Sequence, residues 1–221
     1  MPSAASLLPL DGGLRAAGVR RAGEVAAQPR GTVASGFPLL DAVLPGGGWP
    51  RGALVELQLA SAGVGELQLL AGALAWREQA GRVAFLDPPA EPGLAALHAV
   101  GLAPRAITVA HSREGRDRRW AAEQILRSGG FTAVLLWWTT PLDDRVARRL
   151  SLAIAAGGGL AFIFCPPSTV ANGVPLRLAL HGAGAGAIQV DVLKRRGPPV
   201  SPVRVEWSNA LACLPTSSAR P

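Results

Sequence analysis

The 221-residue chain has few of the residues on which disulfide, metal and membrane chemistry depend. Its two cysteines, Cys165 and Cys213, form no C-x-x-C pair and its three histidines are scattered, so we expect neither a disulfide framework nor a metal site. No uninterrupted apolar run approaches a membrane span, and the N-terminal charges follow the apolar residues, contrary to a secretory signal. We therefore expect a cytoplasmic protein without membrane association.

Lysine is almost absent, because Lys194 is the only one and every other basic residue is an arginine. The chain carries 22 basic against 15 acidic residues, a net charge of +7. Arginine pairs well with phosphates and carboxylates, so this balance favours nucleic acid or an acidic protein surface as a partner. Genomic base composition explains an excess of arginine over lysine equally well, and only local clusters carry weight.

A hydrophobic content of 49% allows one substantial core. We expect residues 1–31 to form a flexible or partly helical arm, residues 32–208 a core domain, and residues 209–221 a flexible tail. Within the core, strand patterns alternate with helix patterns. This alternation predicts an α/β fold with a doubly wound, mostly parallel sheet flanked by helices.

The individual elements follow from hydrophobic periodicity and from caps. Strands are predicted at 53–59, 82–87, 106–110, 131–138 and 160–165, and helices at 66–80, 93–101, 118–130 and 143–159. After residue 165 the helical patterns stop. Two further strands, at 187–193 and 202–208, are predicted to pair with each other and to add an antiparallel extension at the C-terminal edge.

The segment 58–70, QLASAGVGELQLL, lies where a phosphate-binding loop joins a strand to a helix. A P-loop has the pattern G-x-x-x-x-G-K-[ST], with a lysine for phosphate and a hydroxyl for magnesium. Aligning the second glycine on Gly65 puts Ala60 on the first, and Glu66 and Leu67 on the lysine and hydroxyl positions. We interpret the segment as a degenerate nucleotide loop that keeps the turn and loses the chemistry. Its members are Ala60, Ser61, Ala62, Gly63, Val64, Gly65, Glu66 and Leu67.

The segment 33–57, VASGFPLLDAVLPGGGWPRGALVEL, combines S-G-x-x-x-L-D, a triple glycine and a P-x-G turn. Together with ILRSGGFTAVLLWW and VDVLKRRGPPVSPVRVEW, which follow in order, it resembles the RecA-type recombinase core over most of residues 32–207. Within that superfamily, LPGGGWPRGALVEL, GVGELQLL, WAAEQILRSG and VLKRRG are similar to the ImuA family. That family is associated with translesion DNA synthesis and is related to SulA-type cell-division inhibitors. The resemblance implies a RecA-like fold.

The same resemblance shows where RecA-type ATPases carry their catalytic residues. The strand 131–138 would end on a magnesium-associated aspartate, but Trp137 and Trp138 stand there. The water-activating glutamate that would follow Asp87 falls on two prolines, and Cys165 replaces a phosphate-sensing glutamine. With the loop lysine also lost, we expect no ATPase activity and no nucleotide cofactor. We interpret Asp87 as a strand-end residue that caps a turn.

Arg145, Arg148 and Arg149 lie at i, i+3 and i+4 of a predicted helix and so share one face. We treat them as a candidate contact for a partner or nucleic acid, although a solvated face explains the same spacing. The loops that resemble the DNA-binding loops of recombinases, TTPLDD and PPSTVANGVP, are short and lack basic residues. Because a groove for single strands needs cations and stacking groups, we expect no filament on DNA. Weak nonspecific DNA binding stays open.

Lys194, Arg195 and Arg196 form a second candidate contact at the end of a predicted strand. Strand alternation predicts that Lys194 and Arg196 project together and that Arg195 points the other way. The basic pair that this segment resembles in recombinases lies at a subunit junction, so a protein or nucleic-acid contact is expected here. Trp49, between the triple glycine and Pro50, is expected to cover the mouth of a loop.

These features predict a non-catalytic RecA-like adaptor of SOS-induced translesion synthesis, a component of a DNA-damage mutasome. The ImuA resemblance implies an ImuB-type polymerase homologue and RecA as partners, and an error-prone replicative-type DNA polymerase indirectly. A recombinase-shaped surface without ATP turnover is expected to modulate RecA filaments. Two alternatives stay open: a SulA-like inhibitor of cell division, and a weak RecA-type ATPase or DNA-binding protein.

Overall fold

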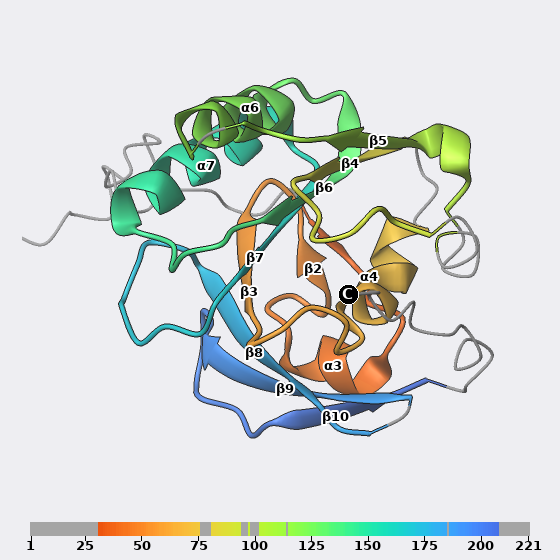
Figure 1. Ribbon diagram of the computed structural model, residues 1–221. Coiled ribbons are helices and arrows are strands. Elements are labelled where there is room, and N and C mark those ends of the chain that lie inside the picture. The colour runs from red at the N-terminus through yellow and green to blue at the C-terminus, as the bar shows by residue number, and fades with distance from the viewer. Residues whose placement is uncertain are drawn as a thin grey trace, which may run out of the picture.

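The computed structural model describes residues 31–75, 81–93, 97, 102–113, 115–184 and 186–207. Within these residues the chain forms an eight-stranded sheet with helices on both faces (Figure 1). Its strand order is β10-β9-β8-β3-β7-β6-β4-β5, and β1 pairs separately with β2. Apart from Gly31, the predicted arm and tail lie outside the described residues. No helix in the described parts is long and apolar enough to cross a bilayer.

Six neighbouring strands of the sheet run parallel. They are β3 (Leu54–Gln58), β4 (Arg82–Leu86), β5 (Ile107–Ala110), β6 (Phe131–Trp137), β7 (Leu160–Cys165) and β8 (Leu176–Gly182). The first five agree with the predicted strands to within one residue at each end. All six residues of β7 are buried because helices cover both faces of the sheet, which explains its continuous apolar sequence.

The antiparallel extension predicted at the C-terminal edge is confirmed. Strand β9 (Ala187–Lys194) pairs antiparallel with β10 (Val203–Glu206) and with β8. The prediction left out β8, which is parallel to β3. Arg177 and His181 interrupt its apolar residues, and only the fold shows that Arg177 is buried against an acidic partner. The short strands β1 (Thr32–Val33) and β2 (Trp49–Pro50) form the separate ladder.

The helices of the structure are α3 (Pro38–Val43), α4 (Glu66–Leu74), α6 (Gly115–Arg127) and α7 (Asp144–Gly157), with a 3₁₀ turn, η1 (Pro104–Ala106). The predicted acidic cap of α7 is confirmed, because the Asp143 side chain accepts a hydrogen bond from the Val146 amide at 2.9 Å. The helix stops at Gly158, which adopts the left-handed conformation that glycine favours. Of the predicted helix 93–101, only two residues are described.

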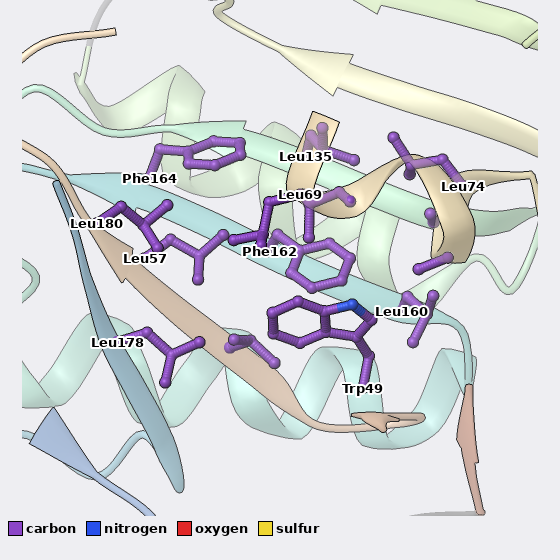
Figure 2. Packing of buried hydrophobic residues seen from close by; sticks show 14 of the residues in the cluster. Trp49, Leu57, Leu69, Leu74, Leu135, Leu160, Phe162, Phe164, Leu178 and Leu180 are labelled. Carbon is purple, nitrogen blue, oxygen red and sulfur yellow. The ribbon is translucent and has the colours of Figure 1, made fainter. Parts of the chain in front are cut away.

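Two buried cores lie on opposite faces of the sheet. Helix α4 packs on one face, and α6 and α7 pack on the other (Figure 1). Trp49 belongs to the α4 core, where it is fully buried and meets Phe162 edge-on, with ring centroids 5.2 Å apart (Figure 2). The expectation that Trp49 covers a loop mouth is therefore wrong. The β1–β2 ladder and the dense packing around the indole direct it into the core.

Candidate functional site

The degenerate loop keeps the backbone of a turn into a helix. Gly63 and Gly65 have φ values of +88° and +105°, in the left-handed region that glycine adopts without strain. Gly65 is the N-cap of α4, and its carbonyl accepts the first helical hydrogen bond, from the Leu69 amide at 3.0 Å. The prediction that these glycines retain the turn from strand to helix is confirmed.

Glu66 occupies the concave side of this turn with its own carboxylate. Its Oε1 and Oε2 accept hydrogen bonds from the Gly63 amide at 2.9 and 3.1 Å, and Oε2 accepts a third from the Gly65 amide at 3.1 Å. The residue is only 5% exposed. In a working P-loop, such amides and the positive end of the helix dipole hold phosphate. Here an internal anion uses them.

Trp207, just after β10, closes the loop from the other side. A Cβ added at Gly65 would lie 2.5 Å from Cη2 of the indole, so the ring lies directly against the glycine. The Trp207 amide donates to the Gly186 carbonyl at 2.9 Å, which fixes the backbone that carries the ring. The sequence indicated only that Trp207 ends the last strand. Its place over the loop depends on how the C-terminal strands pack.

A pocket of about 390 Å³ opens beside the loop, at the carboxyl ends of β4 and β6. It contains two carboxylates, Glu66 and Glu91, and no basic residue. Unit charges of like sign 4 Å apart repel by about 4 kcal/mol at an effective dielectric constant of 20, so a polyphosphate is disfavoured here. Its lining is Ala62, Gly63, Glu66, Leu67, Phe85, Pro88, Pro89, Ala90, Glu91, Pro92, Gly93 and Trp137.

Aromatic rings lie at the strand ends where the resemblance to RecA-type ATPases implies a magnesium-associated aspartate. Trp137 lies between Phe164, at a centroid distance of 4.9 Å, and Phe85, at 5.4 Å. These three side chains come from the neighbouring strands β6, β7 and β4. Hard cations require oxygen ligands, which aromatic rings do not supply. In the described part of the chain, no group of three or more His, Cys, Asp or Glu residues could hold a metal.

Asp87 has a structural role at the end of β4, as predicted. Its carboxylate accepts hydrogen bonds from the Ser112 amide at 2.6 Å, the Ser112 hydroxyl at 2.5 Å and Nε of Arg118 at 2.7 Å. Burial raises the pKa of Asp87, but the hydrogen bonds from Ser112 and Arg118 outweigh burial, so the pKa lies below its ordinary value of 3.8. A carboxylate held in this way connects β4 to α6.

A buried polar network lies beneath the loop 166–175 and was missed from the sequence. Glu56 on β3 is 1% exposed and forms an ion pair with Arg177 at 3.0 Å. The Glu56 carboxylate also accepts hydrogen bonds from the side-chain amides of Gln58 and Asn172, both at 2.6 Å. The available signal was a charged residue inside the apolar run ALVELQL, but its partners lie far away in the sequence.

Cys165, at the position of the expected sensing glutamine, belongs to the same buried region. Burial, followed by the nearby charge of Glu56, raises the pKa of the Cys165 thiol to about 12. The thiol is therefore protonated at physiological pH and is neither a nucleophile nor a ready metal ligand. The Cys165 carbonyl accepts a hydrogen bond from the Leu59 amide at 3.1 Å, which helps to fix the start of the loop.

Comparison with known proteins assigns no family to the chain. No protein-family profile matches it, and no curated protein is significantly similar to it.

At the end of β9, two members of the candidate contact of Lys194, Arg195 and Arg196 form hydrogen bonds within the fold. Lys194 donates to the Asn172 carbonyl at 2.8 Å, and Arg195 donates through Nη1 to the Val43 carbonyl at 2.5 Å. The two adjacent side chains thus reach different parts of the fold, in line with strand alternation. Arg196 follows β9 and is exposed. At this edge Arg196 is the member with most freedom to contact a partner.

The other candidate contact, of Arg145, Arg148 and Arg149, lies on α7. Arg148 pairs with Asp144 at 2.8 Å within the helix, whereas Arg149 pairs with Glu123 on α6 through Nε at 2.8 Å and Nη2 at 2.9 Å. Arg145 is exposed and has no ion pair within the described chain. The predicted common face therefore exists, but one of its members connects two helices.

Proposed function

We propose that this protein is a non-catalytic, RecA-like adaptor of SOS-induced translesion DNA synthesis that acts in the cytoplasm. One observation carries the proposal: the Glu66 carboxylate takes the backbone amides with which a P-loop holds phosphate. A glutamate at the lysine position supplies a carboxylate, in place of a cation, to the amides of Gly63 and Gly65. The loop then preserves the shape of a nucleotide site without a nucleotide.

Three further features support the absence of catalysis. The pocket beside the loop contains two carboxylates and no cation. Aromatic rings fill the strand ends at Trp137, and Cys165 is a buried, protonated thiol. The mostly parallel sheet with its antiparallel edge agrees with the fold that the resemblance implies. A recombinase-shaped domain of this kind acts by binding, and we propose an ImuB-type polymerase homologue and RecA as its partners.

The first test is a calorimetric titration of the chain with ATP and magnesium, and separately with pyrophosphate. We expect no binding by the native chain, and weak pyrophosphate binding by Glu66→Ala, because that substitution vacates the amides of Gly63 and Gly65. The paired substitution Glu66→Lys with Leu67→Thr restores the loop lysine and hydroxyl and is the matched comparison. Tight magnesium-dependent binding of ATP by the native chain would contradict the proposal.

The second test is a pull-down of the purified chain with an ImuB-type homologue and with RecA filaments. We expect retention by at least one of them, and Glu66→Ala should be retained equally because its change lies within the loop. The combined charge reversal of Lys194 and Arg196 tests the predicted contact at that edge. Loss of both partners, together with filamentous cells on overexpression, would instead favour inhibition of cell division.

A further inference from the structure

The face that α6 and α7 turn away from the sheet carries two of the most exposed large apolar side chains in the described chain. Trp120 on α6 is 66% exposed and Leu152 on α7 is 69% exposed. Residues of the same helices that face the sheet, such as Ala122 and Leu150, are completely buried. Trp120 and Leu152 therefore lie on the sides of α6 and α7 that face away from the core.

Helix periodicity and one ion pair place these side chains along a common line. On α6, Arg116, Trp120, Glu123 and Arg127 lie at positions i, i+4, i+7 and i+11, so they share one stripe of the helix surface. On α7, Arg145, Arg149 and Leu152 lie at positions i, i+4 and i+7 and share a stripe in the same way. Because Glu123 and Arg149 bond to each other at 2.8 and 2.9 Å, the two stripes meet. We call this line the α6–α7 seam: Arg116, Trp120, Arg127, Arg145 and Leu152, around the Glu123–Arg149 pair.

The two helices run side by side along the seam. Toward its far end, a Cβ added at Gly157 would lie 1.9 Å from the Leu126 carbonyl oxygen, so α7 approaches α6 as closely as glycine permits. Glu123 and Arg149 bridge the helices about one turn earlier on α6 and about two turns earlier on α7. The outer sides of the two helices therefore lie next to each other. Arg116 to Arg127 spans about 16 Å, or three helical turns.

The charge of the seam is positive and unbalanced. Arg116, Arg127 and Arg145 are exposed and have no acidic partner among the residues described. The central Glu123–Arg149 pair is neutral as a unit, and Asp117 is the exposed acid of α6 outside it. Tryptophan and arginine are the side chains on which binding energy at protein interfaces concentrates. A complementary partner therefore presents carboxylates around an apolar strip.

We propose that the α6–α7 seam binds an acidic amphipathic helix of a partner protein. The partner helix packs across the outer sides of α6 and α7, its apolar side chains contact Trp120 and Leu152, and its carboxylates pair with Arg116, Arg127 and Arg145. A helix suits this surface because its i, i+3, i+4 and i+7 positions match a strip of about three turns. This inference rests on the proposed adaptor role, since it names the face through which such an adaptor holds a partner.

The seam fits a helix better than a single-stranded nucleic acid. Binding to single strands uses several aromatic side chains in a row, with cations that follow the backbone. Trp120 is the exposed aromatic residue of the seam, and the other large apolar side chain of the seam is the aliphatic Leu152. Leu152 offers no ring for base stacking and adds only apolar area. An apolar strip bordered by arginines is the surface that an acidic helix complements.

The test uses the full chain and a fluorescently labelled helical peptide with leucines on one face and glutamates beside them. Its binding is measured by anisotropy at low and at high salt. We expect salt-sensitive binding that Trp120→Ala and Arg145→Glu each weaken about tenfold or more, as expected for interface hot spots. Leu39→Glu and Arg105→Glu are matched controls, because Leu39 is also 69% exposed and Arg105 is exposed on η1. Circular dichroism verifies that each variant is folded.

Other outcomes overturn the inference or separate it from the proposed adaptor role. Equal binding of a peptide with lysines in place of glutamates, or unchanged binding by the seam variants, contradicts an acidic partner at this face. Single-stranded DNA whose binding depends on Trp120 while the peptide does not bind assigns the seam to nucleic acid. A dimer that Leu152→Glu dissociates assigns it to a second copy. If pull-downs of the proposed partners fail while the peptide binds as expected, the adaptor role is contradicted and the binding of an acidic helix at the seam is supported.

Discussion

At the scale of single residues, the chemistry of the loop depends on where one carboxylate points. A glutamate in the first turn of a helix is favourable when it remains solvated, because it faces the positive end of the helix dipole. Glu66 goes further, since it bends back to the amides of Gly63 and Gly65 and is buried there. Glu66 thus stabilises the start of α4 and takes up the amides of Gly63 and Gly65 that would otherwise be open to an external anion.

Removing the Glu66 carboxylate should therefore destabilise the fold and allow an external anion to bind at the turn and restabilise it. Glu66→Ala removes the charged acceptor of the part-buried hydrogen bonds from the amides of Gly63 and Gly65, and we expect a loss of about 2 kcal/mol in the free energy of unfolding. Sulfate should restore part of that loss in the variant and have less effect on the native chain. Urea unfolding with and without sulfate measures both effects. An equal sulfate response in the two proteins would show that Glu66 does not occupy an anion site.

Asp87 gives a prediction about pH. Its pKa is lowered, so its contribution to stability is fully present above about pH 4 and is lost as the pH falls through the lowered pKa. Asp87→Asn should cost about 2 kcal/mol near neutral pH and progressively less in acid. Asparagine tolerates the φ of +54° at this position as aspartate does, so the comparison isolates the charge. A cost that is independent of pH would exclude the charged hydrogen bonds as its source.

At the scale of elements, the loop before α4 and the segment after β10 pack closely together because Gly65 has no side chain. Gly65 is required twice, because its φ is +105° and because any Cβ would collide with the Trp207 ring. The C-terminal antiparallel strands therefore do more than extend the sheet, since they deliver the tryptophan that closes the degenerate loop. Nothing in the local sequence around either residue indicates that they meet.

A double-mutant cycle separates the two requirements. Gly65→Ala should cost about 3 kcal/mol, of which the left-handed backbone accounts for about 1. In the background Trp207→Ala the collision disappears, so Gly65→Ala should cost only the backbone part. Thermal or urea unfolding of the four proteins gives the coupling energy. Gly63→Ala is the control, because its φ is also positive but its Cβ would meet no atom within 4 Å. Additive costs would contradict the contact.

At the scale of the whole molecule, the Glu56–Arg177 network joins the central strand to the loop 166–175. Gln58 and Arg177 both donate to the Ser168 carbonyl, at 3.2 and 3.4 Å, and Asn172 donates to Glu56. These contacts make the loop part of the packed fold. This attachment of the loop supports the proposed adaptor, for which we expect no filament on DNA.

Replacing only one member of the Glu56–Arg177 pair should lower the free energy of unfolding more than replacing both members. Arg177→Met leaves the Glu56 charge buried and should cost about 3 to 5 kcal/mol, whereas Arg177→Met with Glu56→Leu should cost less than the sum of the single changes. The surface pair of Arg204 and Glu206 is the control, where both single changes should cost less than about 1 kcal/mol. Urea unfolding measures all of them. Strict additivity would show that the buried pair is not coupled.

The sequence by itself determined five of the six parallel strands and the loss of the loop lysine and hydroxyl. Those strands, the Asp143 cap and the glycine turns are local, because periodicity and backbone preference act over a few residues. Only the tertiary structure decided what depends on distant partners: the burial of Trp49, the closure of Gly65 by Trp207, and the pairing of Glu56 with Arg177. A charge or a ring has no fixed role until packing brings its partner within contact distance, and that distance is not encoded in local patterns.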